Sequence, residues 1–162
     1  VGYRGQPVDC AALVADSCEW FEPAAEDRGI KMNVEIAGPA EVFGDRGRLQ
    51  QAVANLLDNA IKYTSSGGGI NIRVTHQGDE VLIVVEDTGV GISKQDLPHI
   101  FERFYRADRS RSKPGNGLGL GLVQGIVKMH DGRVEARSVL GRGTVFNVHL
   151  PAMDSQNIAK GQ

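Results

Sequence analysis

An acidic residue directly before a glycine turn is the first feature of this sequence that suggests chemistry. In the segment VVEDTGVGIS, Asp87 follows an apolar run and precedes the turn that contains Gly89 and Gly91. Glycine turns after strands often bind phosphates, because their bare backbone N–H groups can surround an anion. A carboxylate at the mouth of the turn would repel a phosphate. The segment therefore indicates a binding site in which Asp87 has a different partner.

Asn55, Asn59 and Lys62 form a second polar set, on a predicted helix. Asn55 and Asn59 are four residues apart and Lys62 follows three residues later, so the three side chains share one side of the helix. Amide oxygens are ligands that Mg²⁺ accepts, and a lysine can neutralise a phosphate. A plainly solvated helix face would show the same pattern, and the residues alone leave both interpretations open.

The segment GNGLGLGL, residues 115–122, is a third candidate. Its glycines recur at every second position before a predicted helix, where the backbone can approach a phosphate and the unpaired N–H groups of the helix start favour an anion. A glycine-rich hinge before a helix would look the same. The Walker pattern GxxxxGK[ST] is absent, and the turn at Gly89 fails the dinucleotide pattern GxGxxG because Lys94 stands where the third glycine is required.

Hydrophobic periodicity and turn residues predict the elements that position these candidates. On the helix over 45–64, helical spacing predicts a core face made of Leu49, Val53, Leu56, Leu57, Ala60 and Ile61. Asp9 and Asp45 are placed to cap helices, and Gly29 is placed to end the first one. The order of elements predicts an α/β two-layer sandwich, with a mixed, mostly antiparallel sheet and helices on one face. The predicted elements are a helix over 9–27, strands over 31–36 and 41–43, a helix over 45–64, a hairpin over 69–87, a short helix over 95–104, a helix over 118–129 and a second hairpin over 133–151.

Composition limits the class of protein. The 162 residues, 41% of them hydrophobic, are enough for one domain with its own core. The net charge of −2, without a basic stripe, argues against a nucleic-acid partner. The longest apolar run, Val81–Val85, is too short to span a membrane. Cys10 and Cys18 lie on one predicted helix at a spacing that no bridge can close, so we expect buried, reduced thiols in a reducing compartment.

The quoted segments, taken together, resemble a known family. NLLDNAIKYT, EDTGVGI, IFERFYRADRSRSKPGNGLGLGL and GRGTVFNVHLP occur in this order. They are similar to the N, G1, F, G2 and G3 boxes of the catalytic ATP-binding domain (CA, HATPase_c) of bacterial two-component sensor histidine kinases, which has the Bergerat fold. The resemblance runs from about Pro7 to Pro151. It implies a domain over residues 1–153, followed by a polar tail over 154–162 that we expect to be disordered.

The resemblance also implies a role for each matching residue. Asn59 matches the Mg²⁺ ligand, and Asn55 supports metal and phosphates. Asp87 matches the acid that accepts a hydrogen bond from the adenine amino group, above a turn made by Gly89 and Gly91. The implied catalytic residues are Asn55, Asn59, Lys62 and Arg103. The other implied nucleotide contacts are Tyr63, Ile92, Phe104, Arg106, Lys113, Gly115, Gly117, Leu118, Gly119, Leu120 and Thr144.

Further residues follow from the same boxes. Phe101 and Phe104 would anchor a mobile ATP lid, in which Arg109 and Arg111 join the other cations as candidates to reach the β- and γ-phosphates. The last glycine turn, at Gly141 and Gly143, would lie behind the adenine. Gly121 departs from the family, which more often has alanine or serine there. We expect it to weaken the first turn of its helix by about 1 kcal/mol relative to alanine.

Asn55 distinguishes phosphotransfer from hydrolysis. In the hydrolysing members of the superfamily (gyrase, mismatch-repair and heat-shock ATPases), the matching position carries a glutamate that activates water. An amide cannot act as a general base at neutral pH. The sequence therefore favours delivery of the γ-phosphoryl of Mg·ATP to another nucleophile. None of the four histidines, His76, His99, His130 and His149, has the sequence context of the family's phospho-acceptor.

The resemblance therefore implies partners outside this chain. They are the histidine-bearing dimerisation domain of the same parent protein and a cognate response regulator. The first residue, Val1, rather than methionine, indicates a fragment. We expect a monomeric cytoplasmic domain without membrane contact of its own, belonging to a parent anchored in the cell membrane.

The alternatives to a histidine kinase domain are a hydrolase of the gyrase and chaperone type, a non-catalytic nucleotide sensor, and a serine-directed kinase on the same fold. The form IFERFYR favours the histidine kinases that signal to winged-helix response regulators.

Overall fold

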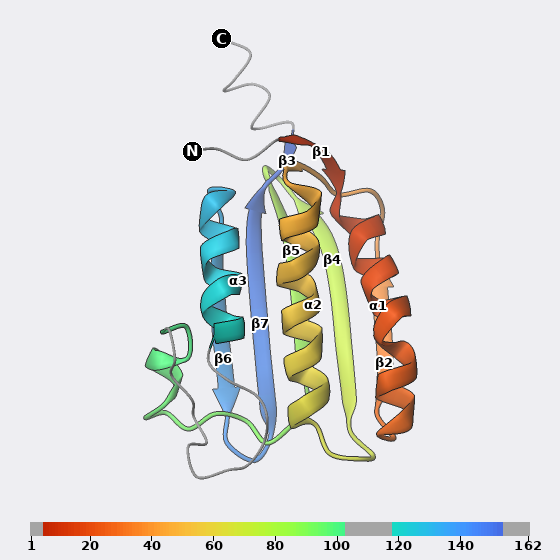
Figure 1. Cartoon of the computed structure of the whole chain (residues 1–162), viewed down its shortest axis with the longest axis vertical. Helices are drawn as coiled ribbons and strands as arrows, with labels where there is room; N and C mark the ends of the chain where they lie inside the picture. Colours follow the sequence, from red (N-terminus) through yellow and green to blue (C-terminus); the bar gives the residue numbers. More distant parts are fainter. Residues whose placement is uncertain (1–4, 103–117, 154–162) are drawn as a thin grey trace.

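In the part of the chain that the structure describes, three α-helices cover one face of a five-stranded sheet (Figure 1). The computed structural model describes residues 5–102 and 118–153. The helices are α1 (Cys10–Asp27), α2 (Arg46–Tyr63) and α3 (Leu118–Met129), and η1 (Leu97–His99) is a short 3₁₀ helix. The strands are β1 (Gln6–Asp9), β2 (Lys31–Ile36), β3 (Glu41–Gly44), β4 (Gly69–Gln77), β5 (Glu80–Asp87), β6 (Arg133–Val139) and β7 (Gly143–Pro151).

The sheet is mixed and mostly antiparallel, as predicted. Its strand order is β2-β4-β5-β7-β6, in which only β2 and β4 run parallel. The two predicted hairpins, β4–β5 and β6–β7, are both present. They lie side by side because β5 pairs with β7 over its whole length. This pairing joins residues about sixty positions apart in the sequence at one end of the sheet.

The predictions about short elements are confirmed only in part. The strand predicted over 41–43 is present as β3, which pairs with β1 in a separate two-stranded sheet. The strand β1 was not predicted, since it has four residues, includes Pro7 and buries only Val8 almost completely. The expected helix over 95–104 is only η1. Pro98 has no N–H to donate, and bonds such as Glu102 N to His99 O (2.9 Å) have the tighter 3₁₀ spacing.

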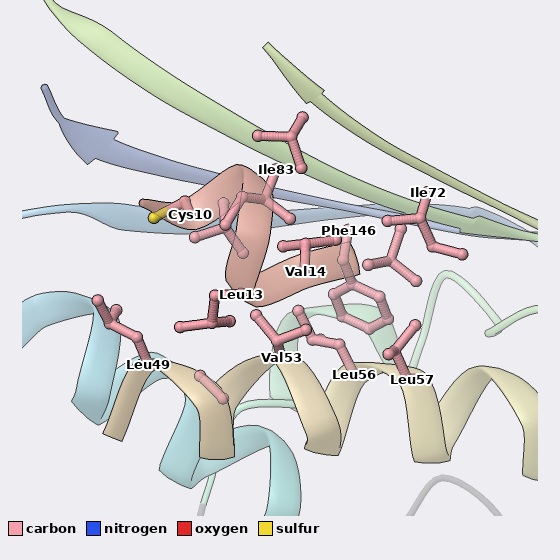
Figure 2. Packing of buried hydrophobic residues seen from close by; sticks show 14 of the residues in the cluster. Cys10, Leu13, Val14, Leu49, Val53, Leu56, Leu57, Ile72, Ile83 and Phe146 are labelled. Atoms are coloured by element: carbon pink, nitrogen blue, oxygen red, sulfur yellow. The ribbon is translucent and has the colours of Figure 1, made fainter. Parts of the chain in front are cut away.

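The core lies between the helices α1, α2 and α3 and the sheet, and Figure 2 shows part of it. The helical face predicted on α2 is buried in full and packs against apolar side chains of β4, β5 and β7. Each fully buried leucine contributes roughly 1.5–3 kcal/mol. The predicted face consists of Leu49, Val53, Leu56, Leu57, Ala60 and Ile61, and all six side chains are at most 5% exposed. This packing fixes the opposite, polar side of α2 toward α3 and solvent.

The ends of α2 are held by contacts that set its position along the sheet. Asp45 caps its start, accepting from Arg48 N at 3.1 Å. Asp45 N donates to Nε2 of the buried His130 at 3.0 Å, and His130 Nδ1 donates to Ile126 O at 2.8 Å. His130 therefore joins the end of α3 to the start of α2. At the other end, Arg28, the C-cap residue of α1, donates to Lys62 O at 3.3 Å and so satisfies a terminal carbonyl of α2.

The predicted burial of the two cysteines is confirmed. Cys10 and Cys18 are buried and free. Burial raises the pKa of the Cys10 thiol to about 12 and that of Cys18 to about 11, so both remain protonated at neutral pH. No helix within residues 5–102 and 118–153 is long and apolar enough to cross a membrane.

Candidate functional site

The predicted site residues that the structure describes gather toward one end of the molecule. The end of β5 with Asp87, the end of α2 with Lys62 and Tyr63, and the turn between β6 and β7 all lie at the lower end in Figure 1. The first turn of α3, with Gly119, lies beside α2 on the same face of the sheet. The sheet therefore supplies one side of the site, and the two helices supply the other.

Three polar side chains form a row across the end of the sheet. Thr144 lies directly opposite Asp87 on β5 and directly opposite Ser138 on β6. Side chains of opposed residues point to the same face of a sheet, with Cβ atoms about 5 Å apart. Asp87 and Thr144 are 8% and 6% exposed. The hydroxyl oxygens of Ser138 and Thr144 are 2.9 Å apart. We call these three residues the polar row.

Asp87 is the charged member of the polar row. Its Oδ1 accepts a hydrogen bond from Gly89 N at 2.8 Å. Burial raises the pKa of Asp87 above its ordinary value, and the nearby charge of Glu86 raises it further. The backbone N–H groups of Gly89 and Thr144 lower this pKa, but by less than burial raises it. The carboxylate is therefore poorly solvated, and an additional N–H donor from a ligand would stabilise it.

The segment after Asp87 is bonded to three other parts of the fold. Val90 N donates to Tyr63 O at 3.0 Å, which joins the turn to the last residue of α2. Gly141 N donates to Val90 O at 2.7 Å, which joins it to the turn between β6 and β7. Ile92 N donates to Ser138 Oγ at 2.7 Å. These bonds fix the path of the backbone beside the polar row.

Glycine is required in this turn for two different reasons. A Cβ on Gly89 would collide with the carbonyl oxygen of Tyr63 and would lie 2.8 Å from Asp87 Oδ1. Gly91 has a φ of +76°, which favours glycine, and its Cβ position is blocked by the backbone of Val139. The tight turn predicted from Gly89 and Gly91 is therefore present, close against α2 on one side and β6 on the other.

The polar side of α2 carries the second predicted set. Asn55, Asn59, Lys62 and Tyr63 are all partly exposed, in contrast to the buried side of the helix. Asn55 Nδ2 donates to Gly119 O, in the first turn of α3, at 3.2 Å. Lys62 Nζ lies 3.3 Å from Asp58 Oδ2, one turn earlier. Because a partly exposed pair of this kind contributes little, the lysine can exchange Asp58 for another anion.

Four further residues named in the sequence analysis lie where the helices meet the segment after the turn. Phe101 packs edge-on against Phe146 of β7, with ring centroids 6.3 Å apart. Ile92 and Leu120 are partly buried against the core. A Cβ on Gly121 would lie 3.2 Å from Phe101 O, so the absence of a side chain permits this approach. Gly121, predicted only to weaken its helix, therefore also has a packing role.

The remaining predicted site residues lie outside the described part of the chain. Their proposed contacts with phosphates stay predictions. They are Arg103, Phe104, Arg106, Arg109, Arg111, Lys113, Gly115 and Gly117.

A comparison with protein families decides which kind of domain this is. The family described as histidine kinase-, DNA gyrase B-, and HSP90-like ATPases (HATPase_c) matches residues 44–154, which include α2, the turn at Gly89, α3 and the second hairpin. The chain belongs to this ATPase family. The family resemblance predicted from the sequence is thereby confirmed.

Relatives of this ATPase domain are sensor histidine kinases. The chain is 40% identical over 142 residues to the sensor histidine kinase RppB of Synechocystis sp., covering 86% of this chain and 31% of that protein. It is 36% identical over 153 residues to the histidine-protein kinase BaeS of Escherichia coli, covering 93% of this chain and 33% of BaeS. The chain thus spans about a third of the length of these relatives.

Solved structures confirm the predicted fold of the ATPase domain. The mycobacterial sensor histidine kinase MprB matches with a TM-score of 0.82 and 33% identity, covering 91% of this chain and 99% of that one. Full-length ShkA in complex with AMPPNP matches with a TM-score of 0.82 and 30% identity, covering 94% of this chain and 32% of that one. The sheet with helices on one face is therefore the Bergerat fold of histidine kinase catalytic domains.

Two residues of the ATPase domain that organise the site were not predicted. The position of Ser138 beside Thr144 follows only from the register of β6 with β7. Arg28, which bonds the carbonyl end of α2, looks like any exposed arginine in the sequence. The only available signal for Ser138 was its position five residues before Gly143 across a predicted hairpin turn, and this does not by itself indicate a binding site.

Proposed function

We propose that this chain is the catalytic domain of a two-component sensor histidine kinase. In this function it binds Mg·ATP and transfers the γ-phosphoryl group to a histidine on a separate dimerisation domain. The observation that carries the proposal is the buried Asp87, which lies beside a turn bonded to the end of α2. The carboxylate of Asp87 can bind the base of a nucleotide, and the amides on α2 can bind its phosphate end.

The base end of the proposed site is the polar row. Asp87 Oδ1 is already bonded to Gly89 N, and its burial makes a further donor favourable. The exocyclic amine of adenine is such a donor. The bonds from Val90 to Tyr63 and from Gly141 to Val90 hold the turn in place, so little ordering remains for the ligand to induce. This arrangement supports Asp87, Gly89, Gly91, Ile92 and Thr144 as base contacts.

The phosphate end is the polar side of α2. Asn55 uses its amide nitrogen for Gly119 O, which leaves its Oδ1 as an acceptor, and Asn59 offers a second amide oxygen one turn later. Neutral oxygen donors in this number fit Mg²⁺, which takes its other ligands from water and phosphates. Bound there, Mg²⁺ would supply charge stabilisation for the transferring phosphoryl group. We propose Asn59 as its protein ligand and Lys62 as the cation that compensates phosphate charge.

Asn55 supports transfer over hydrolysis. Its amide nitrogen donates to a backbone carbonyl, so the side chain is held as a donor toward α3. An amide in this position cannot remove a proton from water. The residues of α2 therefore bind and orient the nucleotide, and the nucleophile that accepts the γ-phosphoryl group comes from outside this chain.

The acceptor histidine is proposed to lie outside this chain. His130 is 1% exposed and bonded at both nitrogens. His149 contacts Glu80 and Glu135, each at 3.2 Å, and His99 contacts Glu102 at 2.8 Å. His76 lies on β4, near the end of the sheet away from Asp87. Because the relatives are about three times longer, a dimerisation domain of the same parent is the proposed source.

The wider role follows from the same proposal. We propose a parent sensor kinase that passes its phosphoryl group to a cognate response regulator. We also propose that this catalytic domain, residues 1–153, works in the cytoplasm while the parent is anchored in a membrane. The relatives RppB and BaeS are histidine kinases, which supports signalling through a sensor kinase. No nucleic-acid partner is proposed, given the net charge of −2.

A transfer assay tests the proposal directly. The chain is mixed with ATP labelled at the γ-phosphate, Mg²⁺ and a separately purified histidine-bearing dimerisation domain, and acid-labile label on that domain is measured. We expect transfer that requires Mg²⁺ and the acceptor histidine, and disappears when that histidine is replaced by glutamine. Steady phosphate release by the chain alone, without transfer, would support a hydrolase instead. Binding of ATP with neither activity would support a nucleotide sensor.

A further inference from the structure

We propose that Ser138 sets the purine specificity of the site by fixing the hydroxyl hydrogen of Thr144. In this arrangement Thr144 and Asp87 offer only acceptors to a bound base. The polar row would then select a purine that carries an amino group at C6 and reject one that carries a carbonyl there. This inference rests on the proposed function, since it concerns the base end of the same nucleotide.

Each of the two hydroxyls has one hydrogen to donate, and the contacts of Ser138 determine where both hydrogens go. Ser138 Oγ lies 2.8 Å from Gly143 O, and a carbonyl oxygen can only accept, so the single hydrogen of Ser138 goes there. Ser138 Oγ also accepts from Ile92 N at 2.7 Å. Its remaining lone pair faces Thr144 Oγ1 at 2.9 Å, and Thr144 must therefore be the donor in that contact. The hydroxyl hydrogen of Thr144 is thus directed to Ser138.

The consequence concerns what Thr144 can offer to other partners. With its hydrogen used, Thr144 Oγ1 retains only lone pairs. Thr144 is the strand neighbour of Asp87, and ionised Asp87 is also acceptor-only. Two adjacent, buried acceptors favour the N–H groups of an amine. They disfavour a carbonyl oxygen, which would be desolvated without a donor.

Ser138 acts through other residues and is therefore a positioning residue. It spans three segments: β6, the start of β7 and the turn that follows Asp87. A merely structural role would weaken all nucleotides alike when the hydroxyl is removed. If Ser138 instead positions the hydroxyl hydrogen of Thr144, removing its hydroxyl changes the ratio of the affinities for two purine nucleotides. The proper probe is inosine triphosphate, which differs from ATP at C6 and in the hydrogen on N1.

The experiment measures dissociation constants of Mg·ATP and Mg·ITP by calorimetry for the wild-type chain and for Ser138→Ala. We expect the wild-type chain to prefer ATP by at least about tenfold, and Ser138→Ala to reduce this ratio by about fivefold, because the released Thr144 hydroxyl can donate to the C6 carbonyl. Ser138→Thr, which keeps the hydroxyl, should retain the wild-type ratio. Thr144→Val should lower the preference for ATP over ITP. The double variant Thr144→Val/Ser138→Ala should show the same preference as Thr144→Val alone.

A matched control separates loss of a buried hydroxyl from the proposed role. Ser17 on α1 is 4% exposed and donates to Leu13 O at 2.9 Å, and α1 lies beside β2, at the opposite edge of the sheet from β6 (Figure 1). Ser17→Ala should leave the ATP to ITP ratio unchanged. If Ser138→Ala does not melt cooperatively, Ser138→Cys takes its place, because a thiol is a weak donor and acceptor.

The outcomes separate this inference from the proposed function. A wild-type chain that binds no adenine nucleotide overturns the proposed function, and this inference with it. A wild-type chain that binds ATP but does not distinguish it from ITP overturns the inference alone. Equal weakening of both nucleotides in Ser138→Ala, with an unchanged ratio, would make Ser138 structural and also overturn it. A reduced ratio that Ser138→Thr does not show supports it.

Discussion

The two ends of the proposed nucleotide site are built in different ways. The base end is part of the sheet, where Asp87 and Thr144 are neighbours in adjacent strands and the following turn is bonded to α2, to β6 and to the second hairpin turn. The phosphate end consists of side chains on the polar side of α2. Within the described residues, Asn55 makes one bond to α3, Lys62 pairs with Asp58 on its own helix, and Asn59 makes no side-chain hydrogen bond.

This difference shows which part of the site is rigid before a ligand arrives. Backbone bonds across three elements fix the base end, so its geometry is a property of the fold. At the phosphate end, the fold fixes the helix but leaves side chains whose polar groups are available to a ligand. We therefore expect substitutions at the base end to affect stability as well as affinity, and those at the phosphate end to affect transfer most.

The largest expected effect is on transfer, at the phosphate end. Asn59→Ala removes the proposed metal ligand and should reduce the rate of transfer to a supplied dimerisation domain by at least about 100-fold, comparable to losing one transition-state contact in other enzymes. Binding of adenosine should be nearly unchanged, because the polar row is untouched. Gln50→Ala, on the exposed surface of α2, is the control. Undiminished transfer by Asn59→Ala would remove its metal role.

The next effect is on stability, at the base end. Gly89→Ala places a Cβ against the carbonyl of Tyr63 and should lower the free energy of unfolding by at least about 2 kcal/mol, because backbone rather than a flexible side chain must move. Gly38→Ala meets nothing within 4 Å and serves as the control. Urea unfolding measures both variants. Equal stability of the two would mean that the turn is not held as tightly as its contacts indicate.

A smaller effect on stability is expected at the contact between α2 and α3. Asn55→Ala removes the bond to Gly119 O and should lower the free energy of unfolding by about 1 kcal/mol, the usual net value of one hydrogen bond. Gln51→Ala, at an exposed position of the same helix, controls for the higher helix propensity of alanine. If both variants were equally stable, the contact between α2 and α3 would contribute nothing to the fold.

The smallest effect is the pH dependence that comes from Asp87. Burial raises the pKa of Asp87 in the folded state, so the folded chain binds more protons than the unfolded chain between the two pKa values. Stability from this group is therefore present below its ordinary pKa and is lost as pH rises through the raised value. Relative to Asp87→Asn, the wild-type chain should become less stable over that interval. Denaturant unfolding at a series of pH values measures the difference, and the opposite slope would contradict the burial of the charge.

Local features of this fold could be predicted from the sequence, because they depend on residues close together in the chain. The caps Asp9 and Asp45 accept from Ala11 N and Arg48 N, at 3.0 and 3.1 Å, as their positions before helices indicated. Gly29 ends α1 with a φ of +72°. The buried side of α2 followed from helical periodicity alone. Asp87 and its glycine turn were found because their order along the chain is distinctive.

Features that depend on pairing between distant segments could not be predicted. The strand β1 is recognisable only by its pairing with β3, and its four residues carry no periodic signal. The role of Ser138 depends on the register of two hairpins at once. Gly121 was judged by helix propensity, yet its position opposite Phe101 O is a matter of tertiary packing. Where a contact joins separate elements, propensity and spacing do not determine it.

The most direct test of the account is the affinity of Mg·ATP for the wild-type chain and for Asp87→Asn. The central claim is that Asp87 accepts a hydrogen bond from the amine of the base. In the variant, an amide donor faces that amine, and calorimetric titration should find binding weakened by about 100-fold. Equal affinity of the two chains for Mg·ATP would contradict the claim, and with it the assignment of the polar row to the base.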